Sequence, residues 1–363
     1  MQTTTPARIM PYQLVCMLLL CRACRLFSLA PTPSADGFAD ILLGVVSQLI
    51  LPLLLLPGLI LLERTRSRSV IDCASLLGGK IVGGAVGVCY LLLFLVELAS
   101  TLAQLQLFAN VHLFERAPHG VVLITAVAAG LAAAFCGLEA VARAAFPIAV
   151  AFGVGFVLIV ALAMPQVDPL RITPLSGETM ENWYEVLAAK SGVSLDAALF
   201  LVLLGTLESG RKRSISAVTL LTGLGAFLVL FVVYGRLGGL AGASNYPFYT
   251  VSKASGLYVF TWLFAAAVKI SLYLTAVRHC LGRILPAPAR TPMCWAAAAV
   301  AAVGGFLLSE QAAWLSTLLG WLETAWPLLA ALLVLPGALL LVSLIRRRKL
   351  KASETPEERG KAL

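Results

Sequence analysis

The sequence predicts an all-α, polytopic membrane protein with ten transmembrane helices, and three observations lead to this prediction. Of the 363 residues, 60% are hydrophobic and only 12% are charged, whereas a soluble domain is about half apolar and a quarter charged. The apolar residues fall in ten long segments, and short clusters of basic residues separate several of them. Each segment is long enough to cross about 30 Å of hydrocarbon at about 1.5 Å per residue.

The loops between the segments support this total and set the orientation. The segments comprise residues 11–30, 41–62, 81–108, 120–136, 144–164, 192–208, 215–235, 256–277, 293–309 and 319–345. Basic residues gather after segments two, six, eight and ten, which places all of them on one side of the membrane. Because basic loops stay in the cytoplasm, both termini are expected there.

The remaining loops lie on the opposite side and carry the acidic residues Asp36, Asp40, Glu115 (beside Arg116), Asp168, Glu178, Glu181 and Glu185. We expect one membrane domain over residues 1–345 with an external loop at 165–191, where a mildly amphipathic helix over 178–189 lies on the membrane surface. Residues 346–363 are expected to form a cytoplasmic tail that is first basic and then disordered. The net charge of +9 is spread over the topology-setting clusters and does not indicate nucleic-acid binding.

Segment one contains two arginines, Arg22 and Arg25, three residues apart and therefore on one helix face. A guanidinium group near the centre of a bilayer costs from about 3 to more than 10 kcal/mol. The helix must turn both side chains toward protein, water or a ligand. We therefore expect segment one to line an internal polar cavity, in which Arg22 or Arg25 binds an anionic group of a ligand.

An acid and a lysine lie deep in other segments. Glu97 lies about 24 Å along segment three from the inner edge, and the two arginines lie about 16–21 Å along segment one, so an ion pair between them is within reach. Such a pair fits both a structural salt bridge and a polar binding cavity. Lys269, with Tyr273 one turn later, is a site candidate by default. It would contact substrate, replace a coupling cation, or neutralise an acid such as Glu97 or Asp196.

Other polar features are expected to be structural. Asp196 caps segment six at the membrane interface, and Glu208-Ser209-Gly210 ends that segment before a basic turn. The glycines of Gly79-Lys-Ile-Val-Gly83-Gly-Ala-Val-Gly87 are four residues apart, a spacing that permits close helix packing. Cys21 and Cys24 have Cys-x-x-Cys spacing, but no second pair or neighbouring histidine accompanies them, so neither a metal nor a cofactor is expected. No nucleophile with a base is recognisable, and an enzyme is not expected.

Charged or helix-breaking residues fall in segments one and six, and a total of ten suggests two halves of five. Many transporters are built from two inverted repeats of this kind, with broken helices at the midplane that hold the substrate. No clear sequence repeat relates the two halves. The two-half plan therefore rests on spacing alone at this point.

Three stretches point to a family. They are Ile9-Met-Pro-Tyr-Gln13, Cys136-Gly-Leu-Glu-Ala-Val-Ala-Arg143 followed by Phe146-Pro147, and Asn245-Tyr-Pro-Phe-Tyr-Thr-Val-Ser-Lys253. They resemble the Ile-Ser-x-x-Gln start, the Gly-(Ile/Leu)-Glu-x-(Ile/Leu)-(Ala/Gly)-Arg…Pro stretch and the Tyr-Pro-x-x-x-x-x-(Arg/Lys) stretch of GerAB-type spore germination permeases. Those proteins belong to the amino acid–polyamine–organocation superfamily.

The resemblance implies a LeuT-like fold, a 5+5 inverted repeat in which helices 1 and 6 are broken. It also implies the B subunit of a nutrient germinant receptor in the inner membrane of bacterial spores, working with an A-type membrane subunit and a C-type lipoprotein. Small germinants such as amino acids would bind between helices one, three, six and eight. The flagged side chains on those helices are Arg22, Arg25, Glu97, Lys269 and Tyr273.

The sequence departs from the family in two places. Relatives have small residues where the first helix unwinds, and this chain has two arginines there. Relatives also often carry Glu-Arg-(Leu/Phe)-Asp after the Tyr-Pro stretch, and this chain reads Ser255-Gly-Leu-Tyr-Val-Phe260. In addition, Glu139 and Arg143 of the second stretch are four residues apart and also fit a simple helix-end pair. These departures leave the ligand open.

Three functions fit these observations. The first is a ligand-sensing receptor subunit that responds by population shift. The second is a proton- or sodium-coupled permease for an amino acid or amine, with Glu97 as a candidate proton carrier. The third is a ligand-free scaffold or ion-conducting subunit, in which the internal charges pair only with one another.

Overall fold

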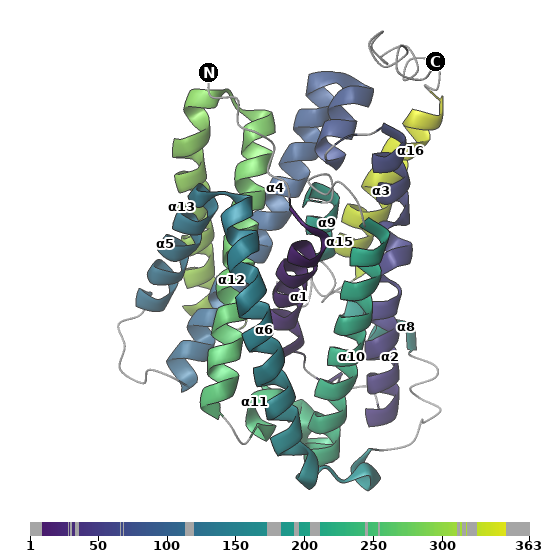
Figure 1. The fold of residues 1–363 in the computed structure, drawn as a ribbon, viewed down its shortest axis with the longest axis vertical. Helices are drawn as coiled ribbons and strands as arrows, with labels where there is room; N and C mark the ends of the chain where they lie inside the picture. The colour runs from purple at the N-terminus through teal and green to yellow at the C-terminus, as the bar shows by residue number, and fades with distance from the viewer. Residues whose placement is uncertain are drawn as a thin grey trace.

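Long apolar helices make up most of the chain and run roughly along one direction (Figure 1). The structure is a computed structural model, and it describes residues 9–27, 29, 31–32, 36–65, 67, 69–112, 120–172, 183–191, 196–203, 211–243, 246–252, 255–310, 313, 317 and 325–345. Within these residues every regular element is helical. The predicted all-α class is confirmed.

The first half of the chain contains α1 (Pro11–Phe27), α2 (Gly37–Leu49), α3 (Leu51–Thr65), α4 (Val70–His112), α5 (Val121–Cys136), α6 (Leu138–Ala163), η1 (Met164–Gln166) and η2 (Pro169–Arg171). The second half contains α8 (Trp183–Ser191), α9 (Ala198–Leu203), α10 (Arg211–Leu237), η5 (Gly238–Ala243), α11 (Pro247–Val251), α12 (Ser255–Ile284), α13 (Ala287–Glu310), α15 (Ala325–Leu329), the π-helical turn η6 (Ala330–Val334) and α16 (Leu335–Ile345).

Six stretches of the described chain are long and apolar enough to cross a membrane: Gly37–Thr65, Val70–His112, Leu138–Gln166, Arg211–Gly242, Gly256–Ile284 and Ala287–Glu310. Two shorter apolar helices, Val121–Cys136 and Ala330–Ile345, accompany them. The chain is therefore a multi-pass membrane protein. The total of ten spans stays a prediction, because α1 has only 17 residues, two of them arginines, and α8 and α9 are shorter still.

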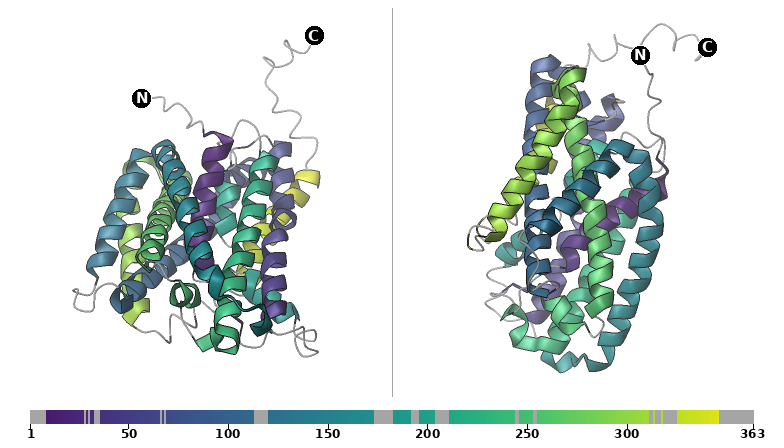
Figure 2. Two further views of the ribbon diagram at one scale, coloured as in Figure 1. Left: turned by 60° about the horizontal axis from the view of Figure 1, so that its bottom comes forward. Right: turned by 90° about the vertical axis from the view of Figure 1, so that its left-hand side faces the viewer.

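The short helix α1 occupies the middle of the bundle (Figures 1 and 2). It packs against α6, α10 and α12, and 11 of its residues are buried. Its start is stabilised locally, because Pro11 needs no hydrogen-bond partner at the first helical position. The side chain of Gln13 accepts a hydrogen bond of 3.0 Å from the backbone N–H of Met10. This is the glutamine half of a capping box.

The glycine run at the start of segment three has two different roles. Gly83 and Gly87 pack closely, since a Cβ on Gly83 would lie 1.9 Å from Ser75 Oγ and one on Gly87 would lie 3.2 Å from Ile284. Gly79 instead bends α4, with φ 80° and ψ −175° and open space around it. The packing prediction was therefore wrong for Gly79. Only glycine adopts that backbone region readily, and the bend lets the helix begin eleven residues before the predicted residue 81.

Two charged residues placed in the external loops by the sequence analysis are in fact buried. Asp40 lies in the first turn of α2 with 0% of its surface exposed, and Lys190 lies in α8 with 3% exposed. Their side chains form an ion pair of 2.9 Å. The helix near residues 178–189 is observed as α8, and it packs along α2. Other predicted features lie outside the described residues: Glu115, Arg116, Glu178, Glu181, Glu208–Gly210, Asn245, Lys253 and the tail 346–363.

A single residue, Gly137, joins α5 to α6. Its φ of 98° and ψ of 164° lie in the region that only glycine readily adopts. The α5 end is also held by Arg278 of α12, whose guanidinium donates a 2.8 Å hydrogen bond to the carbonyl of Ala134 and lies over the Phe135 ring. The chain reverses here without a longer loop. The turn belongs to the Cys136–Arg143 stretch, in which Arg143 donates a 2.5 Å bond to Glu139 at the surface, as the helix-end interpretation expects.

We predict that Gly137→Ala destabilises the protein by about 1–3 kcal/mol, because alanine pays the full strain of this backbone region. A Cβ at this position meets no atom within 4 Å, so steric contact does not contribute. Gly153→Ala in α6 is the matched control, since its Cβ also meets nothing and its backbone is helical. The control is expected to gain stability slightly. The measurement is thermal unfolding in detergent, and equal melting temperatures for the two variants would contradict the prediction.

Candidate functional site: a buried charge cluster

An ion pair between α1 and α4 anchors the site. Arg25 Nη2 lies 2.6 Å from Glu97 Oε1, and the two side chains are 5% and 1% exposed. The sequence analysis expected such a pair, because Glu97 and the two arginines lie at similar depths along their helices. In a low-dielectric interior, each charge is stabilised only when a partner of opposite charge or strong hydrogen bonds replace its lost water. The pair therefore permits an arginine and a glutamate to lie inside the bundle.

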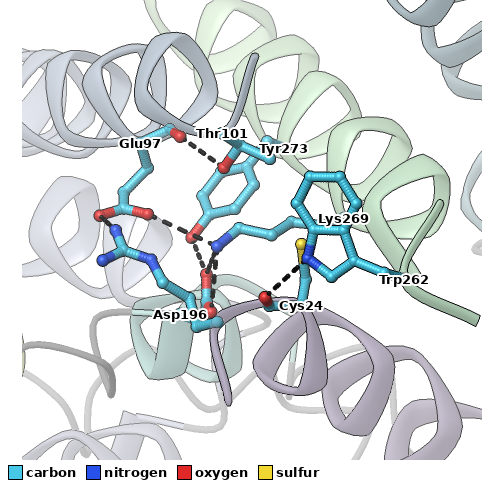
Figure 3. A network of polar contacts seen from close by, with 8 residues as sticks. Cys24, Glu97, Thr101, Asp196, Trp262, Lys269 and Tyr273 are labelled. Atoms are coloured by element: carbon cyan, nitrogen blue, oxygen red, sulfur yellow. Dashed lines mark hydrogen bonds and ion pairs between the residues drawn. The ribbon is translucent and has the colours of Figure 1, made fainter. Parts of the chain in front are cut away.

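Lys269 of α12 connects Glu97 to a second carboxylate (Figure 3). Its ammonium nitrogen lies 3.7 Å from Glu97 Oε2 and 3.1 Å from Asp196 Oδ1. The hydroxyl of Tyr273, one turn further along α12, also donates a hydrogen bond to Asp196 Oδ1. Of the three roles expected for Lys269, the structure shows the third: its ammonium group pairs with the carboxylates of Glu97 and Asp196.

Asp196 is the main correction at this site. It was predicted to cap segment six at the membrane interface, but it is 1% exposed and lies in the centre of the cluster. The reason is that the helical residues Trp183–Ser191 of α8 come before it, so Asp196 lies between two short helices. A residue at such an interruption faces the protein interior, whereas a residue at a membrane boundary faces water.

Arg22 points to another element. Its Nη2 donates a hydrogen bond to the side-chain oxygen of Gln48 in α2. Gln48 in turn donates a 3.0 Å bond to Ser47 Oγ, and Ser47 donates to the backbone carbonyl of Gly44. Arg22 is 0% exposed and lies within electrostatic range of Asp196. Although the two arginines share a helix face, Arg22 therefore binds α2 and Arg25 binds α4.

The cluster holds charges of both signs. Among the described residues it contains the cationic side chains Arg22, Arg25 and Lys269 and the carboxylates Glu97 and Asp196. Charged groups in a membrane interior pair with one another or line a polar cavity. A ligand that enters this cluster would meet two guanidinium groups, which bind carboxylates best.

Aromatic side chains fix the end of α1 beside the cluster. Trp262 Nε1 donates a 3.2 Å hydrogen bond to the carbonyl of Cys24, and the Tyr258 hydroxyl donates a 3.0 Å bond to the carbonyl of Phe27. The last carbonyls of a helix have no partner within it, so these donors replace the missing turn. The ring of Phe94 packs edge-on against Tyr273 at 5.7 Å.

The structure thus brings together four of the five predicted site residues, Arg25, Glu97, Lys269 and Tyr273, and places Arg22 beside them. Sequence reasoning missed Gln48, Tyr258 and Trp262. A signal existed for each: Ser47-Gln48 is a polar pair inside an apolar run, and the two aromatic residues are four apart and so share one face of α12. None of these residues could be assigned a partner before the helices were placed.

Comparison with known proteins adds a family and a fold. The family model described as spore germination protein matches residues 14–313. No curated protein matches the chain. Among solved structures, the substrate-bound, outward-open state of a Na⁺-coupled sialic acid symporter is similar, with a TM-score of 0.62 and 12% sequence identity over 90% of this chain and 80% of that chain. At this identity the likeness shows the fold alone. The family match spans most of the sequence and includes most of α1 and all of α4, α9 and α12, which surround the buried charges, so this chain belongs to the spore germination protein family.

Proposed function

We propose that the chain is the B subunit of a nutrient germinant receptor and that a small, amino acid-like germinant binds at the buried charge cluster. The observation that carries this proposal is the buried group of opposite charges that α1, α4, α12 and Asp196 bring together. A germinant carboxylate would take the place of Glu97 or Asp196 beside the cationic side chains of this group. Membership of the spore germination family supports the biological setting.

The proposed architecture is a LeuT-like 5+5 repeat with ten spans. The six long apolar helices, the two shorter ones, α1, and the interrupted pair α8 and α9 together make ten. The similarity in fold to a symporter supports this plan. The basic clusters then place both termini in the cytoplasm, and the membrane would be the inner membrane of the spore.

The proposed mechanism is a shift between two conformations. A ligand carboxylate that engages Arg22 or Arg25 competes with Glu97 and Asp196 for the same cations. The balance among these pairs then changes, and α1 and the residues around Asp196 rearrange relative to α4 and α12. An A-type membrane subunit and a C-type lipoprotein would receive this change. The conformational shift in this mechanism results from the exchange of ion-pair partners, so it requires neither a metal nor a cofactor.

Two alternatives each have an observation in their favour. The fold similarity to a Na⁺-coupled symporter favours a permease for an amino acid or amine. In that case Glu97 would carry the coupled proton, or a carboxylate of the cluster would bind sodium. The close pairing of Arg25, Glu97, Lys269 and Asp196 favours a ligand-free scaffold or an ion-conducting subunit. The two experiments below separate these alternatives from the receptor.

Arg22→Gln is expected to weaken binding of the germinant by about tenfold to a hundredfold, since a hydrogen bond to a charged group contributes about 1.5–3 kcal/mol. Arg22→Lys keeps the charge but loses the planar fork, so an intermediate loss is expected. The measurement is thermal stabilisation of the purified protein by each proteinogenic L-amino acid in turn. Arg213→Gln, an exposed arginine of α10, is the control and should bind like the wild type. Equal affinity of the Arg22→Gln and Arg213→Gln variants would remove Arg22 from the site, and stabilisation of the wild type by none of the amino acids would favour the scaffold.

Glu97→Gln distinguishes receptor from permease. For the receptor, proteoliposomes containing the wild-type protein should not concentrate any labelled amino acid that stabilises it. For a proton-coupled permease they should, and Glu97→Gln should abolish uptake. Asp72→Asn is the matched control, because Asp72 lies near the start of α4, outside the cluster. Its carboxylate lies 2.9 Å from the guanidinium group of Arg283. If the Asp72→Asn variant concentrates the amino acid and the Glu97→Gln variant does not, the protein is a permease and the receptor proposal is wrong.

A further inference from the structure

A second buried polar group, outside the charge cluster, joins α2, α8 and α10. At its centre is Asp40, which is completely buried in the first turn of α2. Its Oδ2 accepts from Lys190 Nζ of α8 at 2.9 Å and from the Tyr234 hydroxyl of α10 at 3.0 Å. It also accepts a longer bond of 3.3 Å from the backbone N–H of Thr32, between α1 and α2.

The partners of Asp40 are close in sequence to the charge cluster. Thr32 follows the last residue of α1, Phe27, by five positions, and Lys190 precedes Asp196 by six. Asp40 therefore binds one residue that follows α1 in the chain, Thr32, and one that precedes Asp196, Lys190. Figure 1 shows α8 beside α2, as the packing of these helices requires.

The packing around Asp40 is tight, so the positions of its partners are well defined. A Cβ on Gly37 would lie 2.9 Å from the Tyr234 ring, so the start of α2 lies directly against that ring. An acidic residue in the first turn of a helix is also favoured by the helix dipole. A buried carboxylate and a buried ammonium stabilise each other only while they stay together, because each one alone lacks solvation.

We propose that Asp40, Lys190 and Tyr234 form a latch that keeps the buried charge cluster closed. While the latch is formed, α8 and Thr32 are bound to α2, and α2 is bound to α10. When it opens, α8 and Thr32 are released from Asp40, and the cluster-facing side of α1 becomes accessible. Lys190 and Asp40 act here as positioning residues, because they hold α8 against α2.

Two cysteines of α1 report directly on this accessibility. Cys21 and Cys24 are 0% and 2% exposed, and both lie within electrostatic range of Asp196 and Lys269. Figure 3 shows Cys24 beside Trp262 and Lys269. Cys280 of α12 is equally buried at 0% exposed and lies well outside the cluster, where Arg278 and Arg283 are its neighbours in sequence. It provides an internal control within the same molecule.

The experiment measures the rate at which N-ethylmaleimide labels each cysteine of the purified full chain, with peptides resolved by mass spectrometry. Asp40→Asn and Lys190→Met should each raise the labelling rate of Cys21 and Cys24 by about tenfold or more, because labelling of a buried thiol follows the population of the open form. The rate at Cys280 should not change. The double variant should match the single variants, since two residues that act through one contact are not additive.

Tyr234→Phe gives a milder test that does not remove a charge, and a smaller rise at the same two cysteines is expected. Unchanged rates at Cys21 and Cys24 would overturn the latch. An equal rise at Cys280 would show general loosening instead, and multiplied effects in the double variant would show that Asp40 and Lys190 act independently. No ligand is present in these measurements, so their failure is distinguishable from failure of the germinant-binding proposal.

Discussion

The pairing of charges inside the membrane is the constraint on which the rest of this structure depends. Arg25, Glu97, Lys269 and Asp196 come from four different parts of the chain. None of them is tolerable alone in a low-dielectric interior. Each contact therefore fixes the position of one helix against another, and the four side chains together determine where α1, α4, α12 and the residues before α9 meet.

The surroundings of the end of α1 follow from the same constraint. A continuous apolar helix satisfies its backbone internally and needs no polar neighbour. Where α1 ends at Phe27, its last carbonyls need other partners, and Tyr258 and Trp262 of α12 supply them. Charged side chains and the end of α1 thus gather at one place, because both require the polar surroundings that lipid cannot provide.

Apolar length alone was enough to predict much of the fold. The predicted segments 120–136, 215–235 and 293–309 correspond to α5, α10 and α13, with the helices up to six residues longer at an end. Depth along a helix also placed Glu97 level with the arginines, because the rise per residue is fixed. Depth alone did not show which of the two arginines pairs with Glu97, since this depends on how α1 is rotated against its neighbours. Asp40 and Lys190 were misplaced because α8 is only weakly apolar and resembles a surface helix when it is considered without α2.

The hydrogen bonds at the end of α1 separate two properties of this helix. Trp262 and Tyr258 bind the backbone carbonyls of Cys24 and Phe27, whereas the side chains of Arg22 and Arg25 bind Gln48 and Glu97. The frame of the helix is therefore anchored independently of the chemistry it presents. Substitutions on the cluster-facing side of α1 can therefore change the polar contacts of the helix while Trp262 and Tyr258 keep its end in place.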